Sequence, residues 1–322
     1  MRLATLASGS PDGALVVVSR DATRCLSAPG MADTLQQAVE QWTVAEPVLR
    51  LLAERLDRGE GDPLDHSRLL APLPRAWQWL DGSAFPQHGE LMQRAFNLPP
   101  IETDRPLMYQ GLSDRFLPGH ADVPLPSEAD GIDFEGEFGI VTDAVPLGTP
   151  ADRAMPHIKL LLLINDWSLR AIAPQEMKTG FGWVQAKPAC SVAPFAITPD
   201  ELGPTWADGR VHLPLRVRIN GQWFGHPHGR EMQFGFHDLI AHAARTRDLV
   251  AGTIIGSGTV SNADYLSVGS CCLSERRAIE TIAAGAPATP FLHFGDRVTM
   301  EAGEGPSPFG RIDQRVVPAS LP

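Results

Sequence analysis

One stretch decides the fold of this chain: Gly131-Ile132-Asp133-Phe134-Glu135-Gly136-Glu137-Phe138-Gly139-Ile140-Val141. Acidic and apolar residues alternate along it, which predicts a β-strand, because successive side chains in a strand point to opposite faces. Asp133, Glu135 and Glu137 are therefore expected on one face. Carboxylates crowded together repel one another unless a cation lies between them, and an all-carboxylate ligand set favours Mg²⁺ or Ca²⁺ over zinc. The alternative is an acidic strand face that water solvates.

Composition places the chain among ordinary globular proteins. Its 322 residues are 43% hydrophobic and 20% charged, which suits one or two domains with a sizeable core. The net charge of -11 argues against nucleic acid or an anionic membrane as a partner. The first residues lack the apolar segment of a signal peptide, and no apolar run reaches the roughly 18 residues of a membrane span, so we expect a cytoplasmic protein. The four cysteines are expected to be free, packed thiols.

The part of the chain before this stretch begins with β structure. Residues 2–6 and 14–19 predict two strands joined by a turn that ends in Pro-Asp-Gly. Residues 32–56 have apolar side chains at helical spacing, and we expect two short helices interrupted near Pro47. A connection rich in glycine and proline follows. It predicts a domain boundary that separates residues 1–75 from residues 76–322.

The rest of the chain also mixes strands with helices. Residues 158–164 read as a buried strand that runs into Asn165-Asp166, and residues 211–224 as a hairpin that turns at Asn220-Gly221. Helices are expected around 89–96 and 236–249, and further strands at 254–261, 291–300 and 311–317. The glycine turn after residue 254 is not a phosphate-binding loop, because no Gly-Lys-Ser/Thr follows it. The expected fold class is α+β, mostly β.

Four carboxylates could meet around one divalent cation, with water or substrate completing about six positions: Asp81, Glu135, Glu137 and Asp166. Such a cation would make the carbonyl of a β-diketo acid electrophilic and stabilise the enolate that leaves on cleavage. His88 is the candidate general base, because a histidine can accept a proton from water at neutral pH. Glu275 could orient its imidazole. The alternatives are that His88 is structural and that Asp166 caps the next turn.

Three further side chains are candidates for holding a substrate. Arg170 lies four residues beyond Asp166, and Lys187 lies in the sequence Gln185-Ala186-Lys187-Pro188. Either cation could hold a substrate carboxylate or a developing oxyanion, and either could instead be a surface charge. Tyr109 could present its phenol to the site or could serve only as core packing.

The sequence resembles the fumarylacetoacetate hydrolase superfamily from about residue 77 to residue 317. The resemblance is carried by Asp81 with His88 seven positions later, Asp133-Phe134-Glu135-Gly136-Glu137, Asn165-Asp166-Trp167-Ser168-Leu169-Arg170, Ala186-Lys187-Pro188 and Gly256-Ser257-Gly258-Thr259-Val260-Ser261. It implies that Asp81, Glu135, Glu137 and Asp166 bind metal and that His88 activates water. It further implies catalytic roles for Arg170, Lys187 and Glu275, and substrate contacts for Tyr109, Thr259 and Gln175. Ala173 occupies the position of the family's glutamine, with Gln175 nearby.

The resemblance also implies a fold and an activity. The expected fold is a small N-terminal SH3-like barrel followed by a larger mixed β-roll, usually in a homodimer. The implied activity is hydrolysis of a carbon-carbon bond in a small diketo acid, with Mg²⁺ or Ca²⁺, or else Mn²⁺. Fumarylacetoacetate or a close analogue from aromatic-compound catabolism is the expected substrate. The alternatives are decarboxylation or hydration of a 2-oxo acid, and a catalytically silent protein that binds metal.

Overall fold

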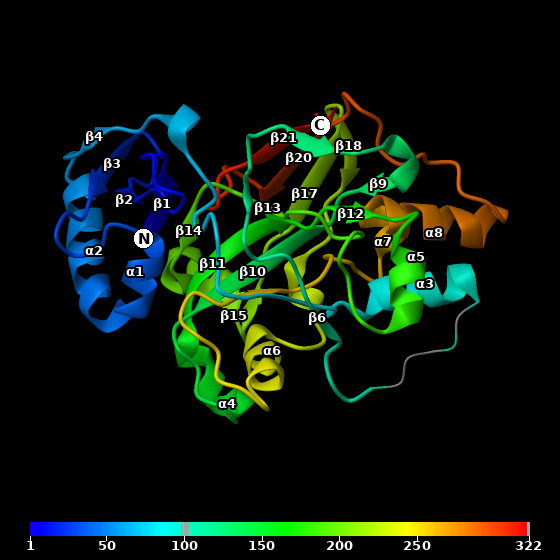
Figure 1. Cartoon of the computed structure of the whole chain (residues 1–322), viewed down its shortest axis with the longest axis horizontal. Helices are drawn as coiled ribbons and strands as arrows, with labels where there is room; N and C mark the ends of the chain where they lie inside the picture. Colours follow the sequence, from blue (N-terminus) through cyan, green and yellow to red (C-terminus); the bar gives the residue numbers. More distant parts are fainter. Residues whose placement is uncertain (98, 100–102, 321–322) are drawn as a thin grey trace.

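The chain folds around one long, mostly antiparallel sheet that crosses the molecule from the N-terminal end (Figure 1). The computed structural model describes residues 1–97, 99 and 103–320. Within these residues the main path of the sheet has the strand order β4-β3-β2-β1-β14-β11-β10-β19-β5-β6. Its centre consists of β11 (Ile158–Asn165), β10 (Gly136–Thr142), β19 (Ile254–Gly256) and β5 (Trp79–Gly82). The expected α+β fold class is confirmed.

The N-terminal part contributes one end of this sheet. The two predicted strands are confirmed as β1 (Arg2–Leu6) and β2 (Ala14–Val18), and β3 (Arg24–Ser27) and β4 (Asp62–Pro63) follow in the order of pairing. Because β1 also pairs with β14 (Ala196–Ile197), the sheet continues across the expected domain boundary. Closure of this part into an SH3-like barrel stays a prediction.

Two helices lie beside these strands, as predicted, but the break between them was expected at the wrong place. The helices are α1 (Leu35–Glu40) and α2 (Trp42–Asp57), and they separate at Gln41, whose backbone is not helical. Thr34 begins α1 with a capping box, in which its side chain and that of Gln37 each accept a backbone N–H. Pro47 lies inside α2 without ending it, so a single proline did not define the boundary.

A second sheet of five strands packs beside the first and has the order β18-β17-β20-β21-β8. Its strands are β8 (Val123–Leu125), β17 (Leu215–Ile219), β18 (Gln222–Gly225), β20 (Arg297–Ala302) and β21 (Ile312–Pro318). The predicted hairpin is confirmed: Asn220 and Gly221 both have positive φ, at 51° and 79°, as a tight two-residue turn requires. The late strands are confirmed too, although the first of them begins only at Arg297.

The acidic stretch forms two strands rather than one. β9 (Ile132–Asp133) ends before Phe134, and β10 begins at Gly136. The prediction of one continuous strand was therefore wrong. The Asp133 carboxylate accepts backbone hydrogen bonds from Phe134, Leu273 and Ser274, at 2.7 to 2.9 Å. Three backbone donors and the Arg170 guanidinium together compensate the buried Asp133 charge.

Helices gather at the end of the molecule opposite the N-terminal part (Figure 1). They include α3 (Pro86–Phe96), which packs against α8 (Leu273–Ala284), and α5 (Ala173–Thr179). α6 (Phe236–Ala243) is shorter than predicted, and α8 was not predicted. The short elements are β6 (Met108–Gln110), β7 (Leu117–Pro118), β12 (Ser168–Leu169), β13 (Ser191–Val192), β15 (Trp206–Ala207), β16 (Arg210–Val211), α4 (Ala151–Ala154) and α7 (Tyr265–Val268), together with 3₁₀ segments at 66–68, 128–130, 155–157, 199–205 and 229–231.

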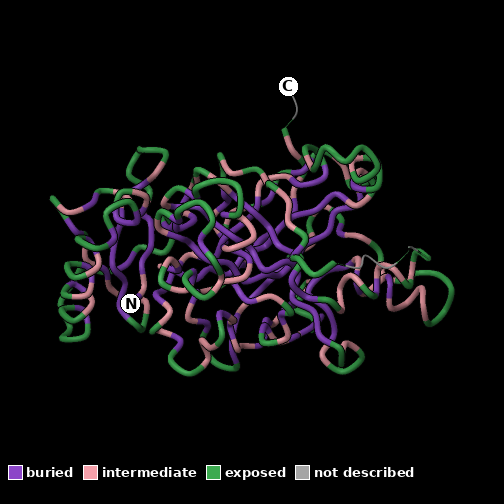
Figure 2. Tube along the Cα trace, turned by 90° about the horizontal axis from the view of Figure 1, so that it is seen from below, coloured by how far each residue is buried: buried purple, intermediate pink, exposed green. Residues whose placement is uncertain are grey.

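Both faces of the central sheet are covered, and the buried trace runs through the middle of the molecule (Figure 2). Along β11, Leu161 and Leu163 pack into one hydrophobic cluster, whereas Leu162 and Ile164 pack into the other. A strand that is buried on both faces reads as an unbroken apolar run, as this one does in the sequence. Among the described residues, no helix has the length and apolar character that crossing a membrane would require.

Candidate active site

Three carboxylates converge at the centre of the long sheet. One oxygen from each of Asp81, Glu137 and Asp166 lies within 4.8 Å of the other two, and all three residues are buried. Asp81 comes from β5, Glu137 from β10, and Asp166 directly follows β11. Three of the four acids predicted to bind metal are therefore brought together, although they are far apart in the sequence.

The register of the sheet explains why these side chains meet. β19 lies between β5 and β10, and Gly256 of β19 is paired with both Asp81 and Gly139. A Cβ at position 256 would lie 2.4 Å from Asp81 Oδ1 and 3.0 Å from Glu137 Oε2. Only glycine leaves room for two carboxylates above this strand. The Gly258 N–H, just beyond the strand, donates to Asp81 Oδ1 at 3.0 Å and fixes its direction.

The donors of this acidic trio suit a divalent cation. Glu137 is fully buried, and neither of its oxygens has a hydrogen-bond partner among the described residues. Burial, together with the charge of Asp166, raises the pKa of Asp81 to about 8. Burial and then the charge of Asp81 raise the pKa of Glu137 well above its usual value. Carboxylates that are this poorly compensated indicate a position for positive charge, and their oxygens match Mg²⁺, Ca²⁺ or Mn²⁺.

Glu135, the fourth predicted ligand, lies beside the trio and is held by two cations. Lys187 Nζ donates to Glu135 Oε2 and to Asp166 Oδ2, each at 2.6 Å, and the Arg170 guanidinium pairs with the other oxygen of Glu135. Burial alone would raise the pKa of Glu135, but the charges of Lys187, Arg170 and His88 lower it. Glu135 is therefore an ionised carboxylate at the edge of the trio.

Lys187 is buried and Arg170 is half-buried at the site, and both are paired with carboxylates, so neither is a free surface cation. The Arg170 guanidinium also donates to Asp133 Oδ2 at 2.8 Å, which completes a bridge between two acids of the opening stretch. Lys187 Nζ lies 5.4 Å from the centre of the Tyr109 ring. Nearby carboxylates, first Asp166 and then Glu135, overcome the effect of burial and raise the pKa of Lys187, so its amine stays protonated.

Asp166 has two further neighbours, of which one was predicted. The Tyr109 hydroxyl donates to Asp166 Oδ2 at 2.5 Å, and the Cys190 thiol donates to Asp166 Oδ1 at 3.0 Å. Tyr109 is placed by β6, where it pairs with Asp81 of β5, and its ring meets that of Trp183 edge-on. No sequence motif marked Cys190 or Trp183. The only feature of the sequence that could have indicated them is that both lie within four residues of Lys187.

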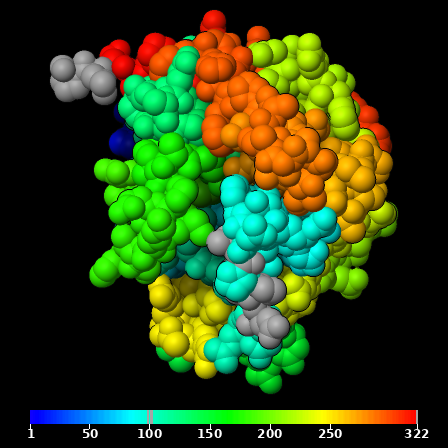
Figure 3. Space-filling view, turned by 90° about the vertical axis from the view of Figure 1, so that its right-hand side faces the viewer, coloured from blue at the N-terminus to red at the C-terminus, as the bar shows by residue number. Residues whose placement is uncertain are grey.

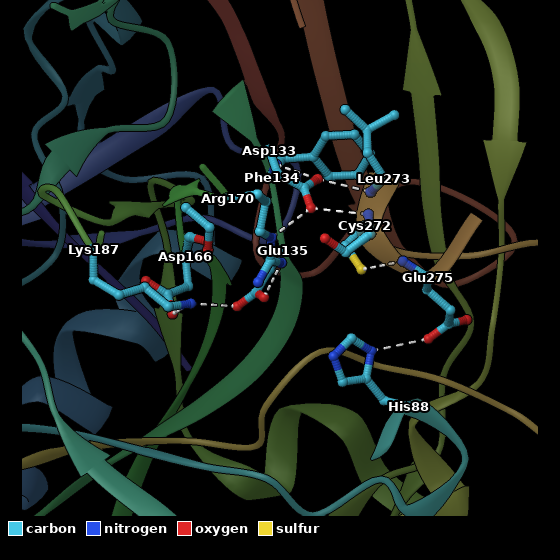
Figure 4. A network of polar contacts seen from close by, with 12 residues as sticks. His88, Asp133, Phe134, Glu135, Asp166, Arg170, Lys187, Cys272, Leu273 and Glu275 are labelled. Atoms are coloured by element: carbon cyan, nitrogen blue, oxygen red, sulfur yellow. Dashed lines mark hydrogen bonds and ion pairs between the residues drawn. The ribbon is translucent and has the colours of Figure 1, made fainter. Parts of the chain in front are cut away.

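His88 and Glu275 form a pair on the other side of Glu135 (Figure 4). His88 Nδ1 lies 3.1 Å from Glu275 Oε2, and the side-chain exposures are 18% for His88 and 0% for Glu275. His88 comes from the first turn of α3 and Glu275 from the first turn of α8. The expected pairing is thus present in the geometry. Burial raises the pKa of the Cys272 thiol, which lies beside the pair.

The two remaining candidates are placed differently. Thr259 is buried in the loop after β19, next to Gly258, whose N–H holds Asp81. Gln175 is exposed on α5, and no hydrogen bond of its side chain is found within residues 1–97, 99 and 103–320. The surface is hollowed between the green segment that carries α5 and the cyan α3, beside the orange α8 (Figure 3). This hollow opens next to the helix that carries His88.

Comparisons with solved structures identify the fold. Two solved structures share the fold over nearly the whole chain. Maleylpyruvate hydrolase from Sphingobium sp. SYK-6, solved with manganese(II) and pyruvate, has a TM-score of 0.67 at 15% identity and covers 99% of this chain and 100% of that one. 5-Carboxymethyl-2-hydroxymuconate delta-isomerase from Mycobacterium smegmatis has a TM-score of 0.63 at 20% identity, with 100% of both chains covered.

The family follows from the sequence itself. The family model for the fumarylacetoacetate (FAA) hydrolase C-terminal region matches residues 78–317, and that for fumarylacetoacetase N-terminal domain 2 matches residues 1–75. The chain belongs to the fumarylacetoacetate hydrolase family. Fumarylacetoacetase from Caenorhabditis elegans is 24% identical over 277 residues, which are 76% of this chain and 64% of that protein. 2,4-Didehydro-3-deoxy-L-rhamnonate hydrolase from Sphingomonas sp. (strain SKA58) is 26% identical, over 50% of this chain and 54% of that protein. The chain therefore spans less than two thirds of the length of these two relatives.

Proposed function

We propose that this protein hydrolyses a carbon-carbon bond in a small diketo acid, either fumarylacetoacetate or a close acylated 3-oxo or pyruvate analogue. One observation carries the proposal. Three carboxylates converge on one point, and Asp166, one of the three, lies on the opposite side of Glu135 from the imidazole–carboxylate pair of His88 and Glu275 (Figure 4). The first group suits a cation that binds the substrate, and the second suits proton transfer to and from water.

The trio of Asp81, Glu137 and Asp166 would hold Mg²⁺, Ca²⁺ or Mn²⁺, with Glu135 beside it. Once bound, such a cation polarises the oxygens of the diketo group and lowers the energy of the negative charge that develops during cleavage. The fit rests on the donors of this chain: oxygen ligands only, fully buried, with two orphaned Glu137 oxygens. The maleylpyruvate hydrolase structure, which shares the fold, was solved in complex with manganese(II).

His88 would perform the proton transfers. Its imidazole takes a proton from water as the water oxygen attacks a carbonyl carbon of the substrate. The carbon-carbon bond then breaks, its electron pair leaves on the departing carbon, and that carbon finally accepts a proton. The Glu275 carboxylate, buried and 3.1 Å from Nδ1, holds the ring and stabilises its charged form. The products are two carboxylic acids.

The remaining polar residues would bind and orient the substrate. Lys187 already joins Glu135 to Asp166, so its ammonium lies where it can support negative charge on a substrate oxygen. Tyr109 and Arg170 border the same carboxylates. We extend the proposal to Thr259, in the loop beside Asp81, and to Gln175, on the α5 side of the hollow.

The test is a substrate screen with product analysis. Purified protein loaded with Mg²⁺ or Mn²⁺ is mixed with a panel of diketo acids, and loss of their ultraviolet absorbance is followed. The proposal expects cleavage of at least one compound into two acids in equal amounts. Release of CO₂ or formation of a hydrated product would replace it with decarboxylation or hydration of a 2-oxo acid. No turnover of any compound would favour a catalytically silent metal-binding protein.

We also propose a homodimer, a division into domains at residues 75 and 76, and a cytoplasmic location. The exposed apolar side chains of Met177, Phe181 and Val184, on and after α5, support an association surface. The separate family matches to residues 1–75 and 78–317 support the division. Light scattering coupled to gel filtration measures the assembly, and a monomeric mass at micromolar concentration would contradict the homodimer.

A further inference from the structure

A second group of potential metal ligands lies beside the acidic trio and differs from it in chemistry. One atom from each of His88, Cys272 and Glu275 lies within 4.8 Å of the other two. Imidazole nitrogen, thiol sulfur and carboxylate oxygen are the ligands that zinc uses in proteins, usually three of them with a fourth position left to water. The trio offers oxygen alone. The two groups therefore differ in the kind of cation that each prefers.

The position of each ligand is fixed by the packing of α3 against α8. Cys272 is the N-cap residue of α8, and its Sγ accepts the Glu275 N–H at 3.3 Å. Glu275 follows in the first turn, and His88 reaches it from the first turn of α3. The backbone of Cys272 also bridges to that of Glu135, which anchors the start of α8 to the acidic strand. The three ligands thus approach one point from two packed helices.

Glu275 gives an independent sign that this group can hold a cation. Its side chain is fully buried, and Oε2 faces His88, but Oε1 has no hydrogen-bond partner among the described residues. A buried carboxylate oxygen without a partner is costly, and a cation beside it would remove that cost. His88 is partly exposed, so a cation can approach from the side of the hollow.

We propose that His88, Cys272 and Glu275 form a binding site for a thiophilic divalent cation of the zinc class, and that its occupation switches the enzyme off. The cation binds His88 Nδ1 and Glu275 Oε2, and the hydrogen that Nδ1 carried moves to Nε2 of the same ring. The Cys272 thiol releases its proton to solvent as sulfur binds. The captured imidazole then cannot accept a proton from water. The switching-off rests on the function proposed above, whereas the binding itself does not.

Binding is tested first, without any substrate. Co²⁺ is added to protein that excess Mg²⁺ has saturated, and the ultraviolet absorption band that only a cobalt–thiolate bond gives is recorded. The proposal expects one equivalent of band-forming Co²⁺, which Zn²⁺ displaces. C272S should lose the band while α8 persists, because a serine hydroxyl can accept the same capping N–H. C190S and C271S are the matched controls and should keep it, although Cys190 also lies beside a carboxylate.

Inhibition is tested next, on whichever substrate the screen identifies. Zn²⁺ is titrated at saturating Mg²⁺, and each variant is compared with its own rate without zinc. The half-inhibiting zinc concentration should rise about tenfold or more in C272S and stay unchanged in C271S. A wild-type protein without the band, or a band that survives in C272S, would overturn the proposal. A band with no turnover of any diketo acid would instead refute the proposed function and leave this site standing.

Discussion

The acidic trio and the group of His88, Cys272 and Glu275 both border Glu135, but the fold builds them in different ways. The trio comes from strands whose register fixes it: Asp81, Gly256 and Gly139 are consecutive partners across three strands. The second group depends on how two helices pack. The trio offers oxygen ligands in a fixed arrangement. The two helices offer the imidazole of His88, which the Glu275 carboxylate holds in place. In the function that we propose, substrate binding and proton transfer are thereby separated.

The largest effect should come from the trio itself. In Glu137→Gln, one carboxylate with two orphaned oxygens is lost from the centre of the site. We expect Mn²⁺ binding to become undetectable by calorimetry and kcat/KM to fall by about a thousandfold or more, because cation and substrate are no longer held together. Glu128→Gln, at an exposed carboxylate that pairs with His293, is the control and should bind Mn²⁺ normally. Normal Mn²⁺ binding in Glu137→Gln would show that the cation site is not the trio, and the contrast between the two groups would fail.

The second prediction separates proton transfer from metal binding. His88→Gln should lower kcat by about a hundred- to ten-thousandfold, the usual contribution of a general base, while calorimetry shows unchanged Mn²⁺ binding. His157 forms a similar pair with Asp143, at 2.6 Å, next to the other end of β10. His157→Gln should therefore leave kcat and Mn²⁺ affinity as they are. Wild-type turnover in the His88 variant would remove this residue from the mechanism.

Glu275 should have a smaller effect, because it acts through His88. Glu275→Gln keeps the size of the side chain and can still hydrogen-bond to Nδ1, but it loses the charge that stabilises the imidazolium. We expect kcat to fall about ten- to a hundredfold with KM unchanged, the range found for partners of this kind. Steady-state kinetics measures both constants. A change in KM alone would instead assign Glu275 to substrate binding.

The smallest expected effect is on stability and concerns only the trio. The pKa of Asp81 rises from 3.8 to about 8 on folding, so between these pH values the folded state binds more protons than the unfolded state. Metal-free protein should therefore lose stability as the pH rises from about 4 to about 8. Its thermal midpoint should fall by several degrees over this range, and added Mn²⁺ should raise it more at pH 8 than at pH 5.

Glu137→Gln supplies the control for this pH dependence. This variant lacks one of the interacting charges. The thermal midpoint of the metal-free variant should therefore depend less on pH, and Mn²⁺ should no longer raise this midpoint at pH 8. An equal slope in the variant and the wild type would mean that the trio does not produce the effect.

Local sequence patterns were enough to predict much of this fold and to nominate the site. The apolar run before Asp166, the Asn220-Gly221 turn and the strands of the N-terminal part follow from periodicity and turn chemistry, and the structure confirms them. The convergence of Asp81, Glu137 and Asp166 was expected from resemblance and from the chemistry of carboxylates. These features depend on short segments whose buried faces leave few alternatives.

Long-range contacts decided the features that were missed. The acidic stretch breaks between Asp133 and Gly136, and backbone N–H groups at the start of α8, about 140 residues later, bind the Asp133 carboxylate. That helix escaped prediction because a cysteine caps it in place of the usual Ser, Thr, Asp or Asn. Glu135 is held by Lys187 and Arg170, an arrangement that no local pattern specifies.

The central claim is that Asp81, Glu137 and Asp166 bind one divalent cation. The most direct measurement is anomalous diffraction from a crystal grown with Mn²⁺ and recorded near the manganese absorption edge. The account predicts a single strong anomalous peak among the three carboxylates, at about 2.1 to 2.3 Å from an oxygen of each. A peak elsewhere in the molecule, or no peak among these side chains at saturating Mn²⁺, would contradict it.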